Sequence, residues 1–260
     1  MCHDTCPHPV SGGAAIEERN EAIALESGSI PAFIAVPDAR PAPGVLLIHD
    51  INGRNAFYED IARRLASLGY LTALPDFFFR QGPPKDDTRE AKRARMDEMT
   101  QSDTLADIRS VLHWLRSHDA STGKVGTIGF CMGGTLVMLA AARPPVPEAT
   151  VAFYGFPRRD RTPLAPILPS DTDEVAAISS PMLAFWGDGD AGVGMDNVRE
   201  YDEALERHGK PHEFHVYPGI GHGFLTFDPG SNAFAASQDA WERTTRFFAE
   251  HLGQPATGGA

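Results

Sequence analysis

Short apolar runs alternate with amphipathic stretches along the chain from about residue 30. The predicted strands are Ile30–Val36, Gly44–His49, Tyr70–Pro75, Lys124–Phe130, Thr150–Gly155, Met182–Gly187 and His212–Pro218. Several of these runs are apolar throughout, which is typical of strands buried on both faces of a parallel sheet. The alternation predicts an α/β fold, with a mostly parallel central sheet and helices on both faces.

Apolar residues at helical spacing predict the helices between these strands. The stripes are Ile61, Leu65 and Leu68; Val198, Tyr201 and Leu205; and Trp241, Thr245, Phe248 and Leu252. The charged segment 86–117 predicts one long helix or two shorter ones, whose apolar face is Ile108, Val111, Leu112 and Leu115. We interpret all of these stripes as core positions.

Length and composition fit one domain of this class. The chain has 260 residues and is 42% hydrophobic, which is close to the upper size of a single core. We predict a single domain over residues 21–252, with flexible tails over residues 1–20 and 253–260. The Pro-rich stretch 157–169 is expected to be an excursion over the surface, because another strand and helix follow it.

Charge and cysteine content restrict the expected partners and the cellular location of the protein. The formal net charge is −12, and such a field repels phosphate backbones, so nucleic acid is not an expected partner. No apolar stretch approaches the roughly 18 residues that span a bilayer, so no membrane partner is expected either. Three cysteines are too few for a disulfide framework. We therefore expect a soluble cytoplasmic protein, monomeric or a small homo-oligomer.

A cluster of possible metal ligands stands at the N-terminus. Cys2, His3, Cys6 and His8 include the residue types that bind zinc, but the spacing of a closed structural site is absent. We predict no metal site there and no cofactor elsewhere.

The stretch Gly129-Phe130-Cys131-Met132-Gly133 carries the most specific chemistry. A predicted strand runs into small-x-Cys-x-small, and an apolar helix begins at once, which is the pattern of a nucleophile elbow with Cys in place of Ser. The turn forces strained backbone angles on Cys131, so its neighbours two positions away must be small. We expect the sulfur to be exposed at a helix N-terminus, where the partial positive charge favours a thiolate.

A thiol nucleophile needs a base and an orienting acid, and two later loops supply them. His222 stands among glycines immediately after the last predicted strand, and Asp190 follows the preceding strand. The order nucleophile, acid, base is that of the α/β-hydrolase fold. All three residues follow the carboxyl ends of strands, where open α/β sheets place their sites.

These motifs resemble the dienelactone hydrolase family. The resemblance rests on G-F-C-M-G-G at 129–134, G-x-x-D-x-x-V at 187–193 and G-H-G-F at 221–224, together with 49–53, 68–80 and 153–155. It covers about residues 24–252 and implies an α/β-hydrolase fold. It implies an oxyanion hole formed by the backbone N–H groups of Ile51 and Met132. It also implies substrate-binding roles for Asp50, Tyr154 and Arg80, where Arg80 holds a substrate carboxylate.

Two positions depart from the family pattern. Asp50 stands where well-known members carry a Glu beside the nucleophile, and Leu225-Thr226 stand where a second Arg would follow G-H-x-F. We expect a hydrolase of carboxylic esters or lactones that forms an acyl-enzyme on Cys131. The alternatives are a general carboxylesterase or thioesterase using the same residues, a thiol redox sensor, or a ligand-binding relative without activity.

Overall fold

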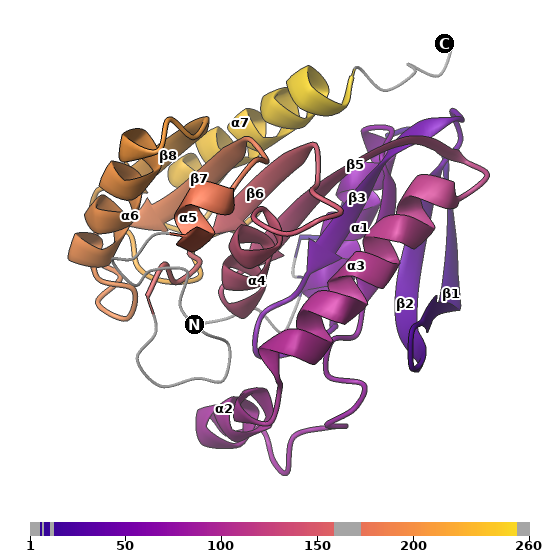
Figure 1. Cartoon of the computed structure of the whole chain (residues 1–260), viewed down its shortest axis with the longest axis horizontal. Helices are drawn as coiled ribbons and strands as arrows, with labels where there is room; N and C mark the ends of the chain where they lie inside the picture. The colour runs from indigo at the N-terminus through magenta and orange to yellow at the C-terminus, as the bar shows by residue number, and fades with distance from the viewer. Residues whose placement is uncertain (1–5, 7, 11–12, 159–172, 254–260) are drawn as a thin grey trace.

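The chain is described by a computed structural model that places residues 6, 8–10, 13–158 and 173–253 (Figure 1). Its centre is an eight-stranded sheet in the order β1-β2-β4-β3-β5-β6-β7-β8. The strands are β1 (Ile16–Leu25), β2 (Gly28–Pro37), β3 (Ala42–Ile48), β4 (Leu71–Pro75), β5 (Ser121–Phe130), β6 (Ala149–Phe153), β7 (Met182–Gly187) and β8 (His212–Tyr217). The helices are α1 (Ala56–Ser67), α2 (Arg89–Asp97), α3 (Gln101–Ser117), α4 (Met132–Ala140), α5 (Asp173–Ala177), α6 (Met195–Arg207) and α7 (Phe234–Leu252).

The mostly parallel sheet is confirmed. Strands β4, β3, β5, β6, β7 and β8 run parallel, whereas β2 is antiparallel to both β1 and β4. Every strand predicted from the apolar runs is present. Strands β3, β4, β6 and β7 are buried along their whole length, as their apolar sequences require.

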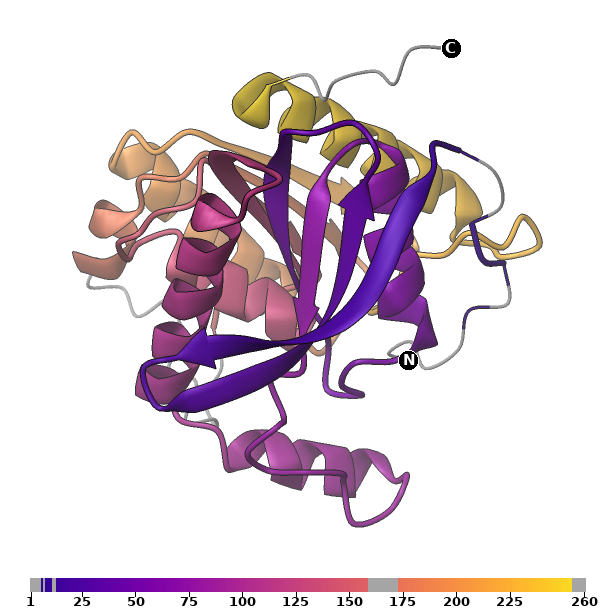
Figure 2. The same ribbon diagram turned by 90° about the vertical axis from the view of Figure 1, so that its right-hand side faces the viewer.

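Helices cover both faces of the sheet, as predicted. Helices α1 and α7 lie on one side and α3 and α4 on the other (Figure 2). The charged segment forms two helices, because the hydroxyls of Thr88 and Thr100 each cap a new helix start. The predicted core stripes are buried with three exceptions: Trp241 and Thr245 are only partly buried, and Leu68, which caps the end of α1, is 44% exposed. Within the described ranges, no helix is long and apolar enough to cross a membrane.

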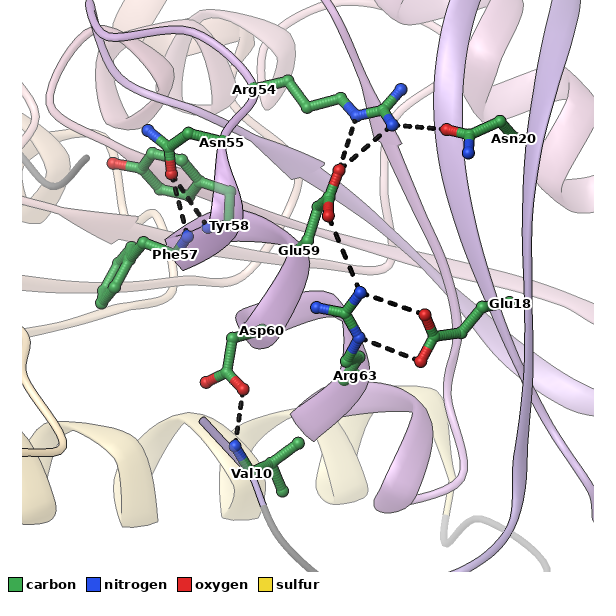
Figure 3. A network of polar contacts seen from close by, with 10 residues as sticks. All are labelled: Val10, Glu18, Asn20, Arg54, Asn55, Phe57, Tyr58, Glu59, Asp60 and Arg63. Carbon is green, nitrogen blue, oxygen red and sulfur yellow. Dashed lines mark hydrogen bonds and ion pairs between the residues drawn. The ribbon is translucent and has the colours of Figure 1, made fainter. Parts of the chain in front are cut away.

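Strand β1 corrects the predicted boundary of the domain. It begins at Ile16, inside the segment expected to be a flexible tail, and it pairs with the whole of β2. The strand was missed because its first half is charged and lacks an alternating apolar face. An ion pair to Arg63 of α1 and a hydrogen bond to Arg54, just before α1, hold the strand in place instead. The Arg63 guanidinium donates to both carboxylate oxygens of Glu18 at 2.9 and 3.0 Å, and Arg54 donates to Asn20 (Figure 3).

The segment before β1 also contacts the domain. The Val10 N–H donates to Asp60 of α1 at 2.6 Å (Figure 3). His8 lies 3.3 Å from Asp228. Cys6 lies beside Asp60, and burial together with that carboxylate raises the pKa of its thiol to about 11. Of the predicted surface excursion and tails, residues 159–169, 1–5 and 254–260 lie outside the described residues.

The common direction of the parallel strands determines where functional side chains can lie close together. Strands β3, β4, β5, β6, β7 and β8 all end at the same edge of the sheet. The loops that follow these ends carry the candidate residues predicted from the sequence.

Candidate active site

Cys131 occupies the sharp turn between β5 and α4. Its backbone has φ 54° and ψ −111°, which is a strained conformation for a residue with a side chain. A Cβ at Gly129 would lie 2.1 Å from the carbonyl oxygen of Gly133, and a Cβ at Gly133 would lie 2.2 Å from that of Ile48. Only glycine therefore fits at both positions, as the elbow pattern predicts.

The surroundings of Cys131 differ from the sequence prediction in one respect. The residue was expected to be exposed, but it is 3% exposed and belongs to the apolar core that includes Ile51 and Met132. A buried site excludes water, and electrostatic interactions there are stronger than in solvent.

Asp190 and His222 form a close pair between the loops after β7 and β8. Oδ2 of Asp190 lies 2.5 Å from Nδ1 of His222. Oδ1 of Asp190 accepts the N–H groups of Gly192 at 3.0 Å and Val193 at 3.2 Å, and the residue is 3% exposed. An ionised carboxylate only accepts hydrogen bonds, so Nδ1 carries the proton and Nε2 becomes the acceptor nitrogen of the ring. This is the tautomer that a general base needs.

Two aromatic residues after β6 flank the imidazole. The ring centroids of Tyr154 and Phe156 lie 5.0 and 5.4 Å from that of His222. Tyr154 has φ 41°, which is unusual for a bulky residue. The Thr135 hydroxyl accepts the N–H of Phe156 at 2.9 Å, which ties this loop to α4.

The loop after β3, which carries Ile51, begins beside the nucleophile turn. The close approach of Gly133 to the backbone of Ile48 and His49 packs the start of this loop against the first turn of α4. Asp50 is fully buried, and its Oδ1 accepts the N–H of Asn52 at 2.8 Å. Ile51 and Met132, the two residues predicted to form the oxyanion hole, therefore belong to adjoining backbone segments.

His49 cross-links the ends of β3 and β4. Its Nδ1 donates to the carbonyl of Asp50 at 2.8 Å, and its Nε2 accepts the N–H of Phe77 at 3.0 Å. Complete burial is the main cause that lowers the pKa of His49 to about 4, so the ring is neutral near pH 7. The sequence motifs indicate no separate role for this residue.

Arg80 already has an internal partner. Its guanidinium forms a two-point ion pair with Asp107 of α3, whose side chain is 5% exposed, and one of the two bonds measures 2.9 Å. Hydrogen bonding to Asp107 raises the pKa of Arg80 above its ordinary value. A substrate carboxylate would compete with Asp107, so the role of Arg80 in substrate binding stays a prediction.

The sequence missed two residues of this site, Phe156 and Arg95. Phe156 follows the strand end after two further residues, so its contact with His222 depends on a fold that brings β6 beside β7 and β8. Arg95 appears in a charged segment that reads as solvated surface, yet it is 8% exposed and donates to the carbonyl of Ile51. Among the described residues, no group of three or more His, Cys, Asp or Glu side chains could hold a metal ion. Cys2 and His3 lie outside those residues.

Comparison with known proteins places the chain among lactone and ester hydrolases. A protein of Yersinia pestis named "Putative carboxymethylenebutenolidase" is 32% identical over 234 residues, which cover 88% of this chain and 86% of that protein. The carboxymethylenebutenolidase of Rhodococcus opacus is 30% identical over 255 residues, which cover 97% of this chain and 98% of that protein.

Solved structures give the same result. A "Putative Dienelactone Hydrolase" from Klebsiella pneumoniae subsp. pneumoniae MGH 78578 matches with a TM-score of 0.82 at 29% identity, covering 91% of this chain and 99% of that chain. The dienelactone hydrolase family matches residues 30–252, a range that contains the Cys131 turn and the loops of Asp190 and His222. The fold is thus of the α/β-hydrolase type, and the enzyme is a hydrolase that acts on lactone or ester bonds. The chain belongs to the dienelactone hydrolase family.

Proposed function

We propose that this hydrolase cleaves carboxylic esters or lactones through Cys131, His222 and Asp190, by way of an acyl-enzyme. The observation that carries the proposal is the Asp190–His222 pair, which fixes an imidazole as a proton acceptor at the edge of the sheet where Cys131 occupies its strained turn. A nucleophile, a base and a group that orients the base are the parts that covalent acyl transfer requires.

Acylation begins when Nε2 of His222 takes the proton of the Cys131 thiol. The sulfur attacks the carbonyl carbon, and the carbonyl electron pair moves to oxygen, which the N–H groups of Ile51 and Met132 stabilise. The carbonyl then re-forms, the bond to the leaving oxygen breaks, and His222 gives its proton to that oxygen. An ester releases an alcohol, whereas a lactone opens and keeps its hydroxyl on the acyl chain.

Deacylation repeats these steps with water. His222 takes a proton from water, the resulting hydroxide attacks the thioester carbon, and the same two N–H groups stabilise the second oxyanion. The C–S bond breaks and the proton returns from His222 to sulfur, so the enzyme is regenerated with the carboxylic acid as product. No step needs a metal or a cofactor.

Contacts around the pair suggest how a substrate is held. Phe156, which is partly exposed beside His222, offers an apolar surface to the substrate, whereas Tyr154 is 1% exposed and would act on a substrate through its contact with the imidazole. Asp50 lies next to Ile51 and fixes the loop through Asn52, so its effect on a substrate acts through the shape of that loop. Arg80 is the cation that could favour a substrate carboxylate, in competition with Asp107.

Intact-mass spectrometry tests the proposal directly. The protein would be mixed with a panel of esters and lactones and quenched within one turnover, and an added acyl mass is expected on Cys131. Cys131→Ala should show no adduct and Cys6→Ala should show the wild-type adduct. The acyl-enzyme would be contradicted if substrates were hydrolysed but no adduct formed on Cys131 with any of them. The same measurement on the slow variant His222→Ala should also show no adduct in that case.

A further inference from the structure

Helix α2 stands away from the sheet (Figure 1), yet one of its charged side chains, Arg95, is buried. Most of its residues are exposed, whereas Arg95 is 8% exposed. Burial lowers the pKa of this guanidinium, and the negative charges of Asp76 and Asp50 oppose that shift. In the described part of the chain, no carboxylate lies within ion-pair distance of Arg95. Burying a charge without a direct counter-ion is costly, so its contacts need an explanation.

Arg95 contacts the loop after β3, which carries Ile51. Nη2 donates to the carbonyl of Ile51 at 3.0 Å, and Nη1 donates to that of Gly82 at 3.3 Å. The guanidinium carbon lies 3.8 Å from the centroid of the Phe78 ring, a cation–π distance. The ring of His49 also stacks on Phe78, with centroids 5.4 Å apart.

Arg95 and His49 act on the two peptide groups that flank the Cα atom of Ile51. His49 donates to the carbonyl of Asp50, which belongs to the same peptide group as the Ile51 N–H. Arg95 donates to the Ile51 carbonyl, which belongs to the next peptide group. A peptide group is planar, so fixing its carbonyl also fixes the direction of its N–H. The rotation of the backbone about Ile51 is thereby restrained from both sides.

We propose that the stack of Arg95, Phe78 and His49 is a positioning device that aims the Ile51 N–H at the developing oxyanion. The inference rests on the proposed function, because it takes the Ile51 N–H as an oxyanion donor. Arg95 itself is a positioning residue and does not touch the substrate. A donor contributes to catalysis only when it already points to where charge develops, so loosening the loop should slow the chemical step and leave ground-state binding almost unchanged.

The test compares two substitutions at Arg95 with a matched control. Arg95→Met keeps the apolar stem and removes the donors, and Arg95→Lys keeps the charge but places its donors on a single nitrogen in place of the planar guanidinium. Arg93→Met alters an exposed arginine of the same helix. The substrate is a neutral 4-nitrophenyl ester, so that charge on the substrate plays no part. We expect Arg95→Met to lower kcat about tenfold to a hundredfold with KM within about threefold of wild type. Arg95→Lys should fall between, and Arg93→Met should match wild type.

A reversible trifluoromethyl ketone supplies a second readout, because Cys131 converts it to a tetrahedral oxyanion. Its affinity should fall by the same factor as kcat in each variant, whereas the affinity for the corresponding alcohol should not change. Wild-type kcat in Arg95→Met, or a loss of kcat without a matching loss of ketone affinity, would overturn the inference. If Arg95→Met does not fold, Arg95→Lys decides by the same criteria. Absence of an acyl adduct on wild-type Cys131 is a separate result, which overturns the proposed function.

Discussion

Asp190 holds His222 with one carboxylate oxygen and is itself held through the other. Oδ2 meets Nδ1 of the imidazole at 2.5 Å, while Oδ1 accepts two backbone N–H groups of its own loop. The carboxylate therefore cannot rotate away from His222 without losing two hydrogen bonds. The nearby Asp188 is occupied differently, because its Oδ1 accepts the N–H of Gly219 at 2.6 Å.

This difference predicts which aspartate matters for catalysis. Asp190→Asn should lower kcat by about 10³-fold to 10⁴-fold, because an amide can donate to Nδ1 and so favour the wrong tautomer. Asp188→Asn should cost less than about tenfold. Steady-state kinetics on one ester gives the ranking, and a larger loss for Asp188→Asn would refute the assignment of Asp190.

Substitution of the nucleophile should remove activity and leave the fold intact. Cys131→Ala is expected to lower ester hydrolysis by roughly 10⁴-fold or more, because no other group can form the acyl intermediate. The change removes only one sulfur atom, so the melting temperature should stay close to that of wild type. Cys6→Ala is the control, since Cys6 lies beside α1 near Asp60 and is not expected to affect turnover. Retention of wild-type turnover by Cys131→Ala would exclude the mechanism.

The ion pair of Arg80 and Asp107 predicts a selective effect on anionic substrates. Arg80→Ala should raise KM for a carboxylate-bearing ester about tenfold to a hundredfold, since a charged hydrogen bond is worth about 1.5 to 3 kcal/mol. A neutral ester of the same size should be unaffected. Asp107→Asn should lower KM for the anionic ester, because it removes the competing carboxylate. Equal responses of both esters to Arg80→Ala would show that the ion pair is structural.

The buried His49 predicts a loss of stability in mild acid. Its pKa is about 4 in the folded protein and about 6.5 when unfolded, so the unfolded chain binds more protons between these values. The free energy of unfolding should therefore fall as pH decreases from about 6.5 to 4, and this group should contribute no pH dependence above that window.

Urea unfolding of wild type and His49→Gln at several pH values checks this prediction. The wild type should lose about 1 kcal/mol more per pH unit than the variant within the window. If the free energy of unfolding fell equally with pH in both proteins, His49 would not be the cause of the pH dependence. This comparison does not depend on the stability of His49→Gln at pH 7.

The Cys131 turn and the parallel strands could be predicted from the sequence, because each depends on residues that are close together along the chain. The strained turn of Cys131 admits only glycine at positions 129 and 133, and that requirement is written in adjacent residues. The apolar runs likewise gave the parallel strands. Phe156 and Arg95 could not be found in this way, because their roles come from contacts with His222 and Ile51 that only the folded sheet creates.

The charged residues of β1, which hide the strand from pattern recognition, also affect whether this edge of the sheet can pair with another molecule. Glu17, Glu18, Arg19 and Glu21 line a strand at the outer edge, where backbone N–H and C=O groups would otherwise offer a template for another chain. Adding a strand there would bring the charged side chains of one molecule against those of its neighbour, which disfavours pairing at this edge. Neutralising this row should make the protein prone to edge-to-edge aggregation even though its core is unchanged.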